Sequence, residues 1–347
     1  MREAMVRVRR WKELDPGERE RFLRRAEVEI EEHLPRVREI VHEVREGGDA
    51  ALVALTERFD GVRIPAGAIR VSQKEVDEAA ALVEPEVREA IAYSLENIRT
   101  FHMRQLPEEL WLTNVRDGVI AGEKVTPIDR VGLYVPRGKG SFPSVAMMLA
   151  APAQVARVPH VVICTPPGPG GEVDPATLLV ASLCAVESVF KVGGAQAIAA
   201  LAYGTETIPR VAKIMGPGNI YVAAAKHLVH VMVDVGLPAG PSESIILADE
   251  SADPKIIALD MLIEAEHGPD SASILVTHCA PLAEAVSARV AALLEDLPEP
   301  RRGFCEKVFA GWGGIVLTQT LAESIEVVNE YAPEHMELLV RDPFGAL

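Results

Sequence analysis

Residues 189–226 read VFKVGGAQAIAALAYGTETIPRVAKIMGPGNIYVAAAK, and this stretch decides the fold class. Twice in succession, an apolar segment of strand length leads through a glycine turn into an alanine-rich segment of helix length. Strands that alternate with helices form parallel sheets, because a parallel connection needs a crossover that a helix supplies. The alternation begins near Asp117 and continues to about Val340. The sequence therefore predicts an α/β protein with doubly wound parallel sheets.

The first hundred residues have a different pattern and predict a helical N-terminal region. Between Arg19 and Arg45, apolar residues recur at helical spacing among many charged ones. The glycine pair at 47–48 is expected to end this helix, and Asp49 to cap the next one. The full chain of 347 residues contains too many strand–helix units for one small sheet, so two α/β units are expected. The segment PAGP at 238–241 is the expected crossing point between them.

Charge and composition exclude several classes of protein. The formal net charge is −16, which disfavours a broad surface for nucleic acid or for an anionic membrane. No apolar stretch reaches the ~18–20 residues of a membrane span, and the basic N-terminus lacks the apolar core of a signal peptide. None of the four cysteines forms a CxxC pair, which is typical of reduced thiols. We therefore expect a cytoplasmic protein with neither nucleic acid nor membrane as a partner.

Three glycine turns follow predicted strands, namely GKG at 138–140, GG at 193–194 and GPG at 216–218. Glycines at the carboxyl ends of parallel strands let backbone N–H groups approach a phosphate, and the following helix N-terminus favours negative charge. Tight turns between a strand and a helix need glycine for purely structural reasons as well. The dinucleotide fingerprint GxGxxG and the triphosphate fingerprint GxxxxGK[ST] do not occur, so the turns alone leave the ligand open.

Glu264 and His267 lie three residues apart at the end of a predicted helix. This spacing places both side chains on one helix face, where a carboxylate and an imidazole are suitable ligands for zinc or manganese. A solvated acidic helix end, with a histidine at the negative end of the helix dipole, is the structural alternative. His227 and His230 have the same spacing within an apolar helix and are interpreted as structural.

Glu334 and His335 form an adjacent acid–imidazole pair just before a predicted strand. Such a pair shares general-base work when both pKa values are tuned toward neutral pH. Neighbours on an extended strand point to opposite sides, so joint action requires a local turn, which Pro333 favours. A surface loop is the alternative interpretation. Ser242, in a turn before another predicted strand, is a candidate for a hydrogen bond to a ligand.

These motifs occur in an order that resembles the histidinol dehydrogenase family. The stretch quoted above is followed by AGPSE, AEHGPDS and APEH, and the order and spacing match from about residue 131 to 340. The resemblance implies two Rossmann-like domains, one inserted in the other, within an intertwined homodimer. We expect an N-terminal arm at 1–24, a first domain at 25–130 plus 241–347 with the metal and catalytic residues, and an inserted domain at 131–240 on the NAD side.

The resemblance also implies an activity, the zinc- and NAD-dependent oxidation of L-histidinol to L-histidine through the aldehyde, in histidine biosynthesis. The implied cofactors are NAD and Zn²⁺, and the implied partner is a small-molecule amino alcohol. By motif, Tyr134, Gln196 and Asn219 resemble the family's NAD contacts. The residues that resemble its catalytic site are Ser242 as a substrate contact, Glu264 and His267 as zinc ligands and substrate contacts, Glu334 as the activator of water, and His335 as the general base and a substrate contact.

Three features depart from the family pattern. The family has glutamine at the position of Glu264, so the metal site carries an extra negative charge here. The turn after GLYVP contains Arg137 and Lys139, which indicates either an anionic contact or a solvated loop. The sequence ends at Leu347, and the family continues with an aspartate zinc ligand and a small C-terminal domain that supplies a histidine ligand and a glutamate to the partner subunit. We therefore expect an incomplete metal site, weak zinc binding and low activity.

Two alternatives remain open. A divergent NAD-dependent dehydrogenase that acts on another amino or hydroxy alcohol agrees with Glu264 and with the cationic turn at Arg137 and Lys139. A non-catalytic ligand-binding or oligomer-forming remnant agrees with the absence of the C-terminal segment. A panel of alcohols distinguishes the first alternative, and NAD binding without turnover under saturating zinc distinguishes the second.

Overall fold

The computed structural model describes residues 6–23, 30–137, 140, 142–236 and 242–347. The chain forms two compact units. The first, called the terminal unit, combines Met1–Val28 with Ala239–Leu347, and the second, called the central unit, is Glu29–Pro238. The chain passes between the units at the expected PAGP segment, whose own residues lie outside the described part.

A four-stranded parallel sheet with the order β6-β5-β4-β7 lies at the middle of the central unit. The chain builds it by the strand–helix alternation that the sequence predicts, and β4, β5 and β6 are buried almost throughout because helices cover both faces. Its elements are β4 (Arg130–Tyr134), α5 (Pro143–Val155), β5 (His160–Thr165), α6 (Pro175–Leu183), β6 (Ser188–Lys191), α7 (Gly194–Tyr203), β7 (Lys213–Met215) and α8 (Ile220–Val229).

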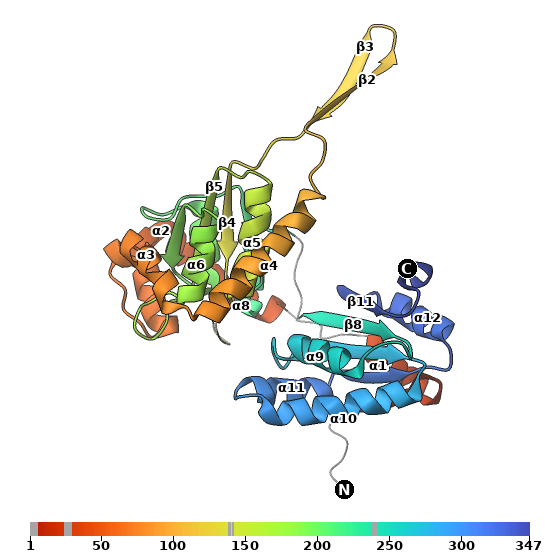
Figure 1. Ribbon diagram of the computed structural model, residues 1–347. Coiled ribbons are helices and arrows are strands. Elements are labelled where there is room, and N and C mark those ends of the chain that lie inside the picture. Colours follow the sequence, from red (N-terminus) through yellow and green to blue (C-terminus); the bar gives the residue numbers. More distant parts are fainter. Residues whose placement is uncertain (1–5, 24–29, 138–139, 141, 237–241) are drawn as a thin grey trace. The chain divides into compact units, whose positions relative to one another are not determined.

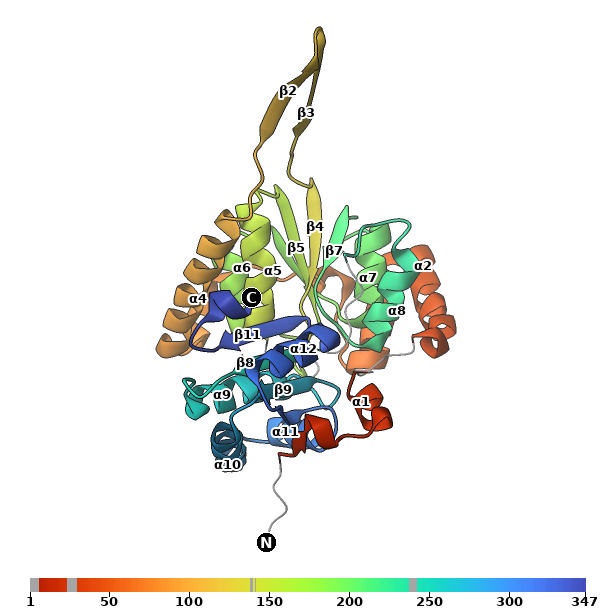
Figure 2. The same ribbon diagram turned by 90° about the vertical axis from the view of Figure 1, so that its right-hand side faces the viewer.

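Two cores flank this sheet, because successive side chains on a strand point to opposite faces. Leu133 and Ile163 pack with α5 and α6, whereas Tyr134 and Cys164 pack with α7 and α8. Figure 2 shows α4, α5 and α6 on one side of the sheet and α2, α7 and α8 on the other. The outer helical elements of these layers are η2 (Glu31–His33), α2 (Leu34–Asp60), η3 (Ala66–Ala68), α3 (Gln73–Leu82) and α4 (Pro85–Met103).

This packing changes the expected domain boundary. The helical segment before residue 130 was expected to belong with the metal and catalytic residues, yet the structure places residues 29–130 in the central unit. The physical reason is that the apolar faces of these helices complete the central cores. Leu52 and Leu55 of α2 are fully buried with α7 and α8, and Ile91 and Leu95 of α4 are buried with α5 and α6.

A kink in α2 confirms the predicted break at the glycine pair. Gly48 has φ 51° and ψ −136°, a conformation outside the helical region. Asp49, however, has a different role from the expected helix cap. Its carboxylate accepts hydrogen bonds from the Thr205 hydroxyl at 2.6 Å, from the Thr207 backbone N–H at 3.3 Å and from the Thr207 hydroxyl. This buried carboxylate thus fastens α2 to the loop that follows α7.

A long hairpin, which the sequence analysis missed, projects from the central unit (Figure 1). It consists of β2 (Leu110–Arg116) and β3 (Val119–Lys124), which pair antiparallel across the Asp117-Gly118 turn. Gly118 has φ +74°, a value that explains the glycine, and the Asp-Gly pair is a strong hairpin signal. Every residue in both strands is exposed.

The terminal unit contains a five-stranded parallel sheet with the order β1-β10-β9-β8-β11. Helices α9, α10 and α11 share a core with one face, and α12 shares a core with the other. The elements are β1 (Val8–Arg10), η1 (Trp11–Glu13), α1 (Pro16–Leu23), β8 (Glu243–Ala248), α9 (Pro254–Ala265), β9 (Ala272–Thr277), α10 (Ala280–Asp296), α11 (Arg301–Ala310), β10 (Gly314–Leu317), α12 (Leu321–Tyr331), β11 (His335–Leu339) and α13 (Pro343–Ala346).

The two sheets share one topology. Apart from β1 at the edge of the terminal sheet, three successive strands of each sheet are laid down in one direction, and the fourth returns to the other side of the first of these. The first and fourth strands, β4 and β7 or β8 and β11, are therefore neighbours at a switch point. The predicted α/β class with parallel sheets is confirmed. Within the described residues, none of the helices has the length and apolarity needed to cross a membrane.

Asp49→Ala is expected to lower the free energy of unfolding by about 2–4 kcal/mol, because it leaves two threonine hydroxyls and a backbone N–H without their buried acceptor. Chemical denaturation monitored by circular dichroism measures the change. Glu46→Ala, an exposed position on the same helix, is the control and should stay within about 0.5 kcal/mol of the parent. Equal stabilities for the two variants would contradict the role of Asp49.

Candidate functional site

The predicted site residues fall into two groups, one in each unit. The central unit holds the three expected NAD contacts, Tyr134, Gln196 and Asn219. The terminal unit holds the five expected metal, substrate and catalytic residues, Ser242, Glu264, His267, Glu334 and His335.

The terminal group gathers at the amino edge of its sheet. Ser242 immediately precedes β8, and His335 begins β11, the strand that pairs with β8 in parallel. In this register His335 lies beside Ser244. Glu264 and His267 lie at the end of α9, in the connection that leads to the start of β9. Because β9 pairs with β8 from Glu243 onward, all five residues lie at the same edge.

Glu334 and His335 are brought together by a backbone reversal between α12 and β11. Ala332 ends α12 in the left-handed region with φ 49°, and Glu334 lies ahead of the strand. The strict alternation of strand side chains therefore does not separate the pair, and His335 Nδ1 lies 3.8 Å from a carboxylate oxygen of Glu334. The local turn that joint action requires is thus present.

A carbonyl group selects the tautomer of His335. Its Nδ1 lies 3.1 Å from the backbone oxygen of Glu243. A carbonyl oxygen only accepts, so Nδ1 carries the proton of the neutral ring and Nε2 is the basic nitrogen. The ring is well exposed, with 61% of the side-chain surface accessible. His335 therefore has an accessible basic nitrogen.

Glu264 is a buried carboxylate with an unused oxygen. The residue is 9% exposed, and its Oε1 atom is buried without a hydrogen-bond partner. Burial raises the pKa of the Glu264 carboxyl, the charges of Glu334 and Glu243 raise it further, and His267 and His335 oppose the rise. The five groups thus share one electrostatic environment, in which a cation would stabilise the ionised carboxylate.

His267 is oriented in a way that suits a metal ligand. Its Nδ1 lies 2.8 Å from the backbone oxygen of Ile263, so Nδ1 donates and Nε2 keeps the lone pair. Metal-bound histidines commonly have such a second partner. Glu264 Oε1 and His267 Nε2 therefore fit zinc as an oxygen–nitrogen donor pair. Among the described residues, no group of three or more His, Cys, Asp or Glu side chains is arranged to hold a metal ion.

The central group lies at the carboxyl edge of its sheet, next to the switch point. Tyr134 ends β4 and is 3% exposed, and its hydroxyl accepts a hydrogen bond from the Gly194 N–H at 3.0 Å. Burial holds the pKa of the Tyr134 hydroxyl above its usual range. The buried phenol thus keeps its own proton at neutral pH.

Gln196 and Asn219 occupy the first turns of α7 and α8. Gln196, one of the expected NAD contacts, is only 2% exposed, so its side chain is buried within the central unit. Asn219 is the N-cap of α8, and its carbonyl oxygen accepts the N–H groups of Tyr221 and Val222 at 3.1 and 3.2 Å. The capping bonds leave the amide NH₂ of Asn219 for a ligand.

The glycine turns in this region have a clear structural function. Gly216 has φ +122°, and a Cβ atom there would lie 2.1 Å from the backbone oxygen of Tyr134. The partly buried Lys226 donates to the Gly216 oxygen at 2.5 Å, and burial lowers the pKa of its ammonium to about 8. A Cβ atom on Gly193 would lie 2.6 Å from the Pro166 ring. Close packing therefore accounts for both turns whether or not they bind a phosphate.

The cationic turn after β4 is partly explained by an internal ion pair. Arg137 donates to a carboxylate oxygen of Glu172 at 2.9 Å and to the Glu172 backbone oxygen at 2.8 Å. This pair favours a structural role for Arg137 over an anionic ligand contact. Lys139, the other cation of the turn, lies outside the described residues.

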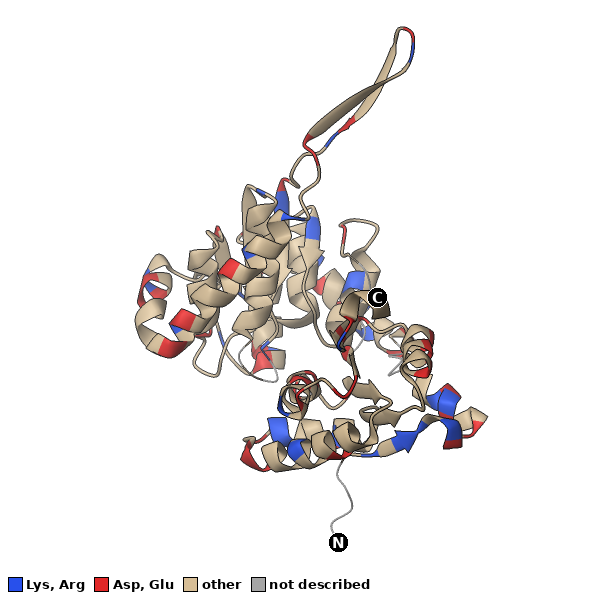
Figure 3. Ribbon diagram, turned by 45° about the vertical axis from the view of Figure 1, so that its right-hand side comes forward, with Lys and Arg blue, Asp and Glu red and all other residues tan. Residues whose placement is uncertain are grey.

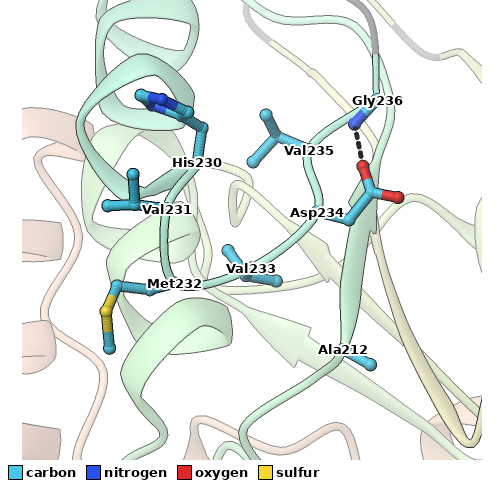
Figure 4. Close-up of a pocket in the computed structure, with 8 residues that line it drawn as sticks. All are labelled: Ala212, His230, Val231, Met232, Val233, Asp234, Val235 and Gly236. Carbon is cyan, nitrogen blue, oxygen red and sulfur yellow. Dashed lines mark hydrogen bonds between the residues drawn. The ribbon is translucent and has the colours of Figure 1, made fainter.

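A depression of about 480 Å³ lies elsewhere on the central unit, beside the loop that follows α8 (Figure 4). It is open to solvent, and its lining includes none of the predicted site residues. Asp234 on its rim is bound to Lys213 at 2.7 Å and to the Gly236 N–H at 2.8 Å. His230 is held by the His227 backbone oxygen at 2.6 Å, in agreement with its structural interpretation.

The family model described as histidinol dehydrogenase matches residues 23–347. This chain belongs to the histidinol dehydrogenase family. A relative named histidinol dehydrogenase from Synechocystis sp. is 48% identical over 339 residues, which cover 98% of this chain and 78% of the relative. A relative named histidinol dehydrogenase homolog from Cereibacter sphaeroides is 51% identical over 96% of this chain and 76% of the relative. The crystal structure of histidinol dehydrogenase from Elizabethkingia anophelis has a TM-score of 0.89 and 32% identity, and the match covers 98% of this chain and 77% of that one.

These comparisons confirm the family predicted from the ordered motifs, and with it an oxidoreductase relationship. Sequence reasoning missed Glu243, which contacts both members of the pair: its carboxylate accepts the Glu334 N–H at 3.1 Å, and its backbone oxygen lies 3.1 Å from His335 Nδ1. Its signal in the sequence was a charged residue at the first position of the buried strand ESIILA.

Asp60 is a second buried carboxyl that the motifs did not indicate. It ends α2, and its Oδ2 atom is buried without a hydrogen-bond partner. Burial raises the pKa of Asp60 to about 6. A carboxyl whose folded-state pKa lies above its unfolded value stabilises the fold at low pH and loses that contribution as the pH rises through the folded value.

Asp60→Asn is therefore expected to raise the free energy of unfolding by about 1–2 kcal/mol at pH 8 and to leave it unchanged at pH 4, once the shift is discounted for partial exposure. Denaturant titrations at the two pH values measure the difference. Asp234→Asn is the control of opposite sign, because bonding to Lys213 and to Gly236 lowers the pKa of Asp234. A pH-independent effect of Asp60→Asn would contradict the assignment.

Proposed function

We propose that this protein oxidises L-histidinol to L-histidine through the aldehyde, with NAD as the oxidant and zinc as the metal, in histidine biosynthesis. The observation that carries the proposal is the gathering of Glu264, His267, Glu334 and His335 at one sheet edge, in a chain of the histidinol dehydrogenase family. The shared order of the two parallel sheets supports the proposal that both units are Rossmann-like.

Different residues would bind the metal and the dinucleotide. Glu264 Oε1 and His267 Nε2 would hold zinc, which when bound orients the amino alcohol and lowers the pKa of its hydroxyl. Tyr134, Gln196 and Asn219 would hold NAD, which supplies the hydride acceptor for both oxidations. Ser242 would contribute a hydrogen bond to the substrate.

The proton transfers are assigned to the pair at the start of β11. In the first oxidation, His335 Nε2 takes the hydroxyl proton as the carbinol carbon loses hydride. In the second, the Glu334 carboxylate takes a proton from the water that adds to the aldehyde. The 3.8 Å approach of the two side chains supports this division, because the imidazole and the carboxylate then serve the same carbon in turn.

The purified protein, with L-histidinol, NAD and added zinc, is expected to form two NADH per histidinol consumed, as followed by absorbance and product analysis. His335→Gln should lower kcat by about 10²–10⁴-fold, because it removes the general base, while NAD affinity stays unchanged. His230→Gln replaces an exposed histidine outside the site and is the matched control.

Two outcomes of this experiment would contradict the proposal. Turnover of other amino or hydroxy alcohols without turnover of histidinol would indicate a divergent dehydrogenase. NAD binding with no turnover of any alcohol under saturating zinc, in folded protein, would indicate a non-catalytic member of the family.

A homodimer is proposed as well, and the β2–β3 hairpin supports it. Two-stranded hairpins are marginally stable when isolated in water, and exposed apolar patches commonly mark interfaces. The pairing register places Leu110, Leu112 and Ile120 on one face, with exposures of 56%, 64% and 66%. Figure 3 shows that most of the hairpin is uncharged. A second copy of the chain would cover this face.

Replacing Leu112 and Ile120 together by glutamate is expected to convert a dimer into a monomer, because the two charges would be buried in the interface. Light scattering after gel filtration measures the mass. Thr113→Glu places one charge on the opposite face of the same strand and should leave the dimer intact. A wild-type monomer, or a dimer that survives the double substitution, would contradict the proposed interface.

A further inference from the structure

A buried carboxylate lies beneath the turn that carries Glu334 and His335. Glu243, the first residue of β8, is 7% exposed. One of its carboxylate oxygens accepts the backbone N–H of Glu334 at 3.1 Å. The other accepts the hydroxyl of Tyr331 at 3.3 Å, and Tyr331 is the last residue of α12. A single side chain thus holds the chain on both sides of the reversal between α12 and β11.

The backbone of Glu243 makes a third contact with the same turn. Its carbonyl oxygen lies 3.1 Å from His335 Nδ1, the contact that keeps Nε2 basic. The side chain and the backbone of one residue therefore act on both members of the pair. Side chains alternate between the two faces of β8, so the Glu243 side chain points to the same face as Ile245 and Leu247, which pack against α12. This orientation lets the Glu243 side chain reach the turn at the end of α12.

The turn at residues 332–334 depends on this carboxylate because few of its own backbone groups are placed to stabilise it. Ala332 is in the left-handed region, Pro333 has no N–H to donate, and Glu334 precedes the first ladder pair of β11. Without the Glu243 carboxylate, the Glu334 N–H would lose its hydrogen-bond acceptor. A shift of about 1 Å in such a group is enough to lower a reaction rate about 10²-fold.

We propose that Glu243 is a positioning residue that fixes the place of Glu334 through its carboxylate and the tautomer of His335 through its carbonyl. The inference deepens the proposed function and rests on it for the reaction itself. Glu243 does not contact the reacting atoms in this assignment. It acts through the two residues that do.

The kinetic test compares two substitutions at this position in the full-length chain. Glu243→Ala should lower kcat for histidinol oxidation about 10²-fold and leave the KM for NAD unchanged, since the expected NAD contacts belong to the other unit. Glu243→Gln keeps an oxygen that accepts the Glu334 N–H and should retain kcat within about tenfold of the parent. Glu326→Ala, an exposed glutamate on α12, is the control and should retain full activity.

A second measurement is independent of turnover. In ¹⁵N-labelled protein, histidine NMR should show the Nδ1–H tautomer of His335 in the parent and also in Glu243→Ala, because the substitution keeps the backbone carbonyl that binds Nδ1. Amide exchange of Glu334 should be at least tenfold faster in that variant. Tyr331→Phe removes one contact of the carboxylate and should give a smaller change, which keeps the test informative if Glu243→Ala fails to fold.

The possible outcomes distinguish the positioning role of Glu243 from the proposed oxidation of histidinol. Parent-like kcat and parent-like Glu334 amide exchange in both Glu243 variants, or an Nε2–H tautomer of His335 in the parent, would overturn the positioning role. A parent protein without histidinol turnover, whose Glu334 amide still exchanges faster in Glu243→Ala, would support the positioning role and contradict the proposed function. A fall in activity for both substitutions, with unchanged Glu334 amide exchange, would also overturn the inference, because the effect would then not act through the position of Glu334.

Discussion

The parallel pairing of β8 with β11 is the constraint on which the terminal site depends. It brings Glu243 and Glu334, 91 positions apart in the sequence, within one hydrogen bond of each other. The pairing follows from the strand order, because β11 returns to the free side of β8, as β7 returns to the free side of β4. The same rule in the central unit sets the end of β4 beside the turn after β7, where Gly216 packs against the Tyr134 carbonyl.

The predicted site residues of the two units lie at opposite edges of their parallel sheets. The expected NAD contacts lie at the carboxyl edge, where helix N-termini favour anions, whereas Glu264, His267 and the pair at 334–335 lie at the amino edge, where α9 and α12 end. Helix C-termini carry partial negative charge, so they disfavour the several carboxylates gathered there. This environment makes a bound cation favourable, which agrees with a metal at Glu264 and His267 and with the raised pKa of Glu264.

Sequence patterns predicted the layers well and the unit boundary poorly. Alternation of strands and helices follows from local periodicity, so the parallel sheets, the break at Gly48 and the ordered motifs could all be found without coordinates. The assignment of the N-terminal helices could not, because an amphipathic helix reveals that it has an apolar face but not which core receives it. The β2–β3 hairpin was also not predicted, although its Asp117-Gly118 turn is a local signal that can be found in the sequence.

The site shows the same division between local and long-range information. Motifs predicted the residues at 264–267 and 334–335, and the structure adds how each ring is oriented, through the carbonyls of Ile263 and Glu243. Asp49 and Glu243 illustrate why such partners escape sequence analysis. Asp49 has the spacing of a helix cap yet binds Thr205 and Thr207, and Glu243 interrupts an apolar strand with a charge. Both residues act on segments far away in the sequence, so only the folded chain reveals what a buried carboxylate holds in place.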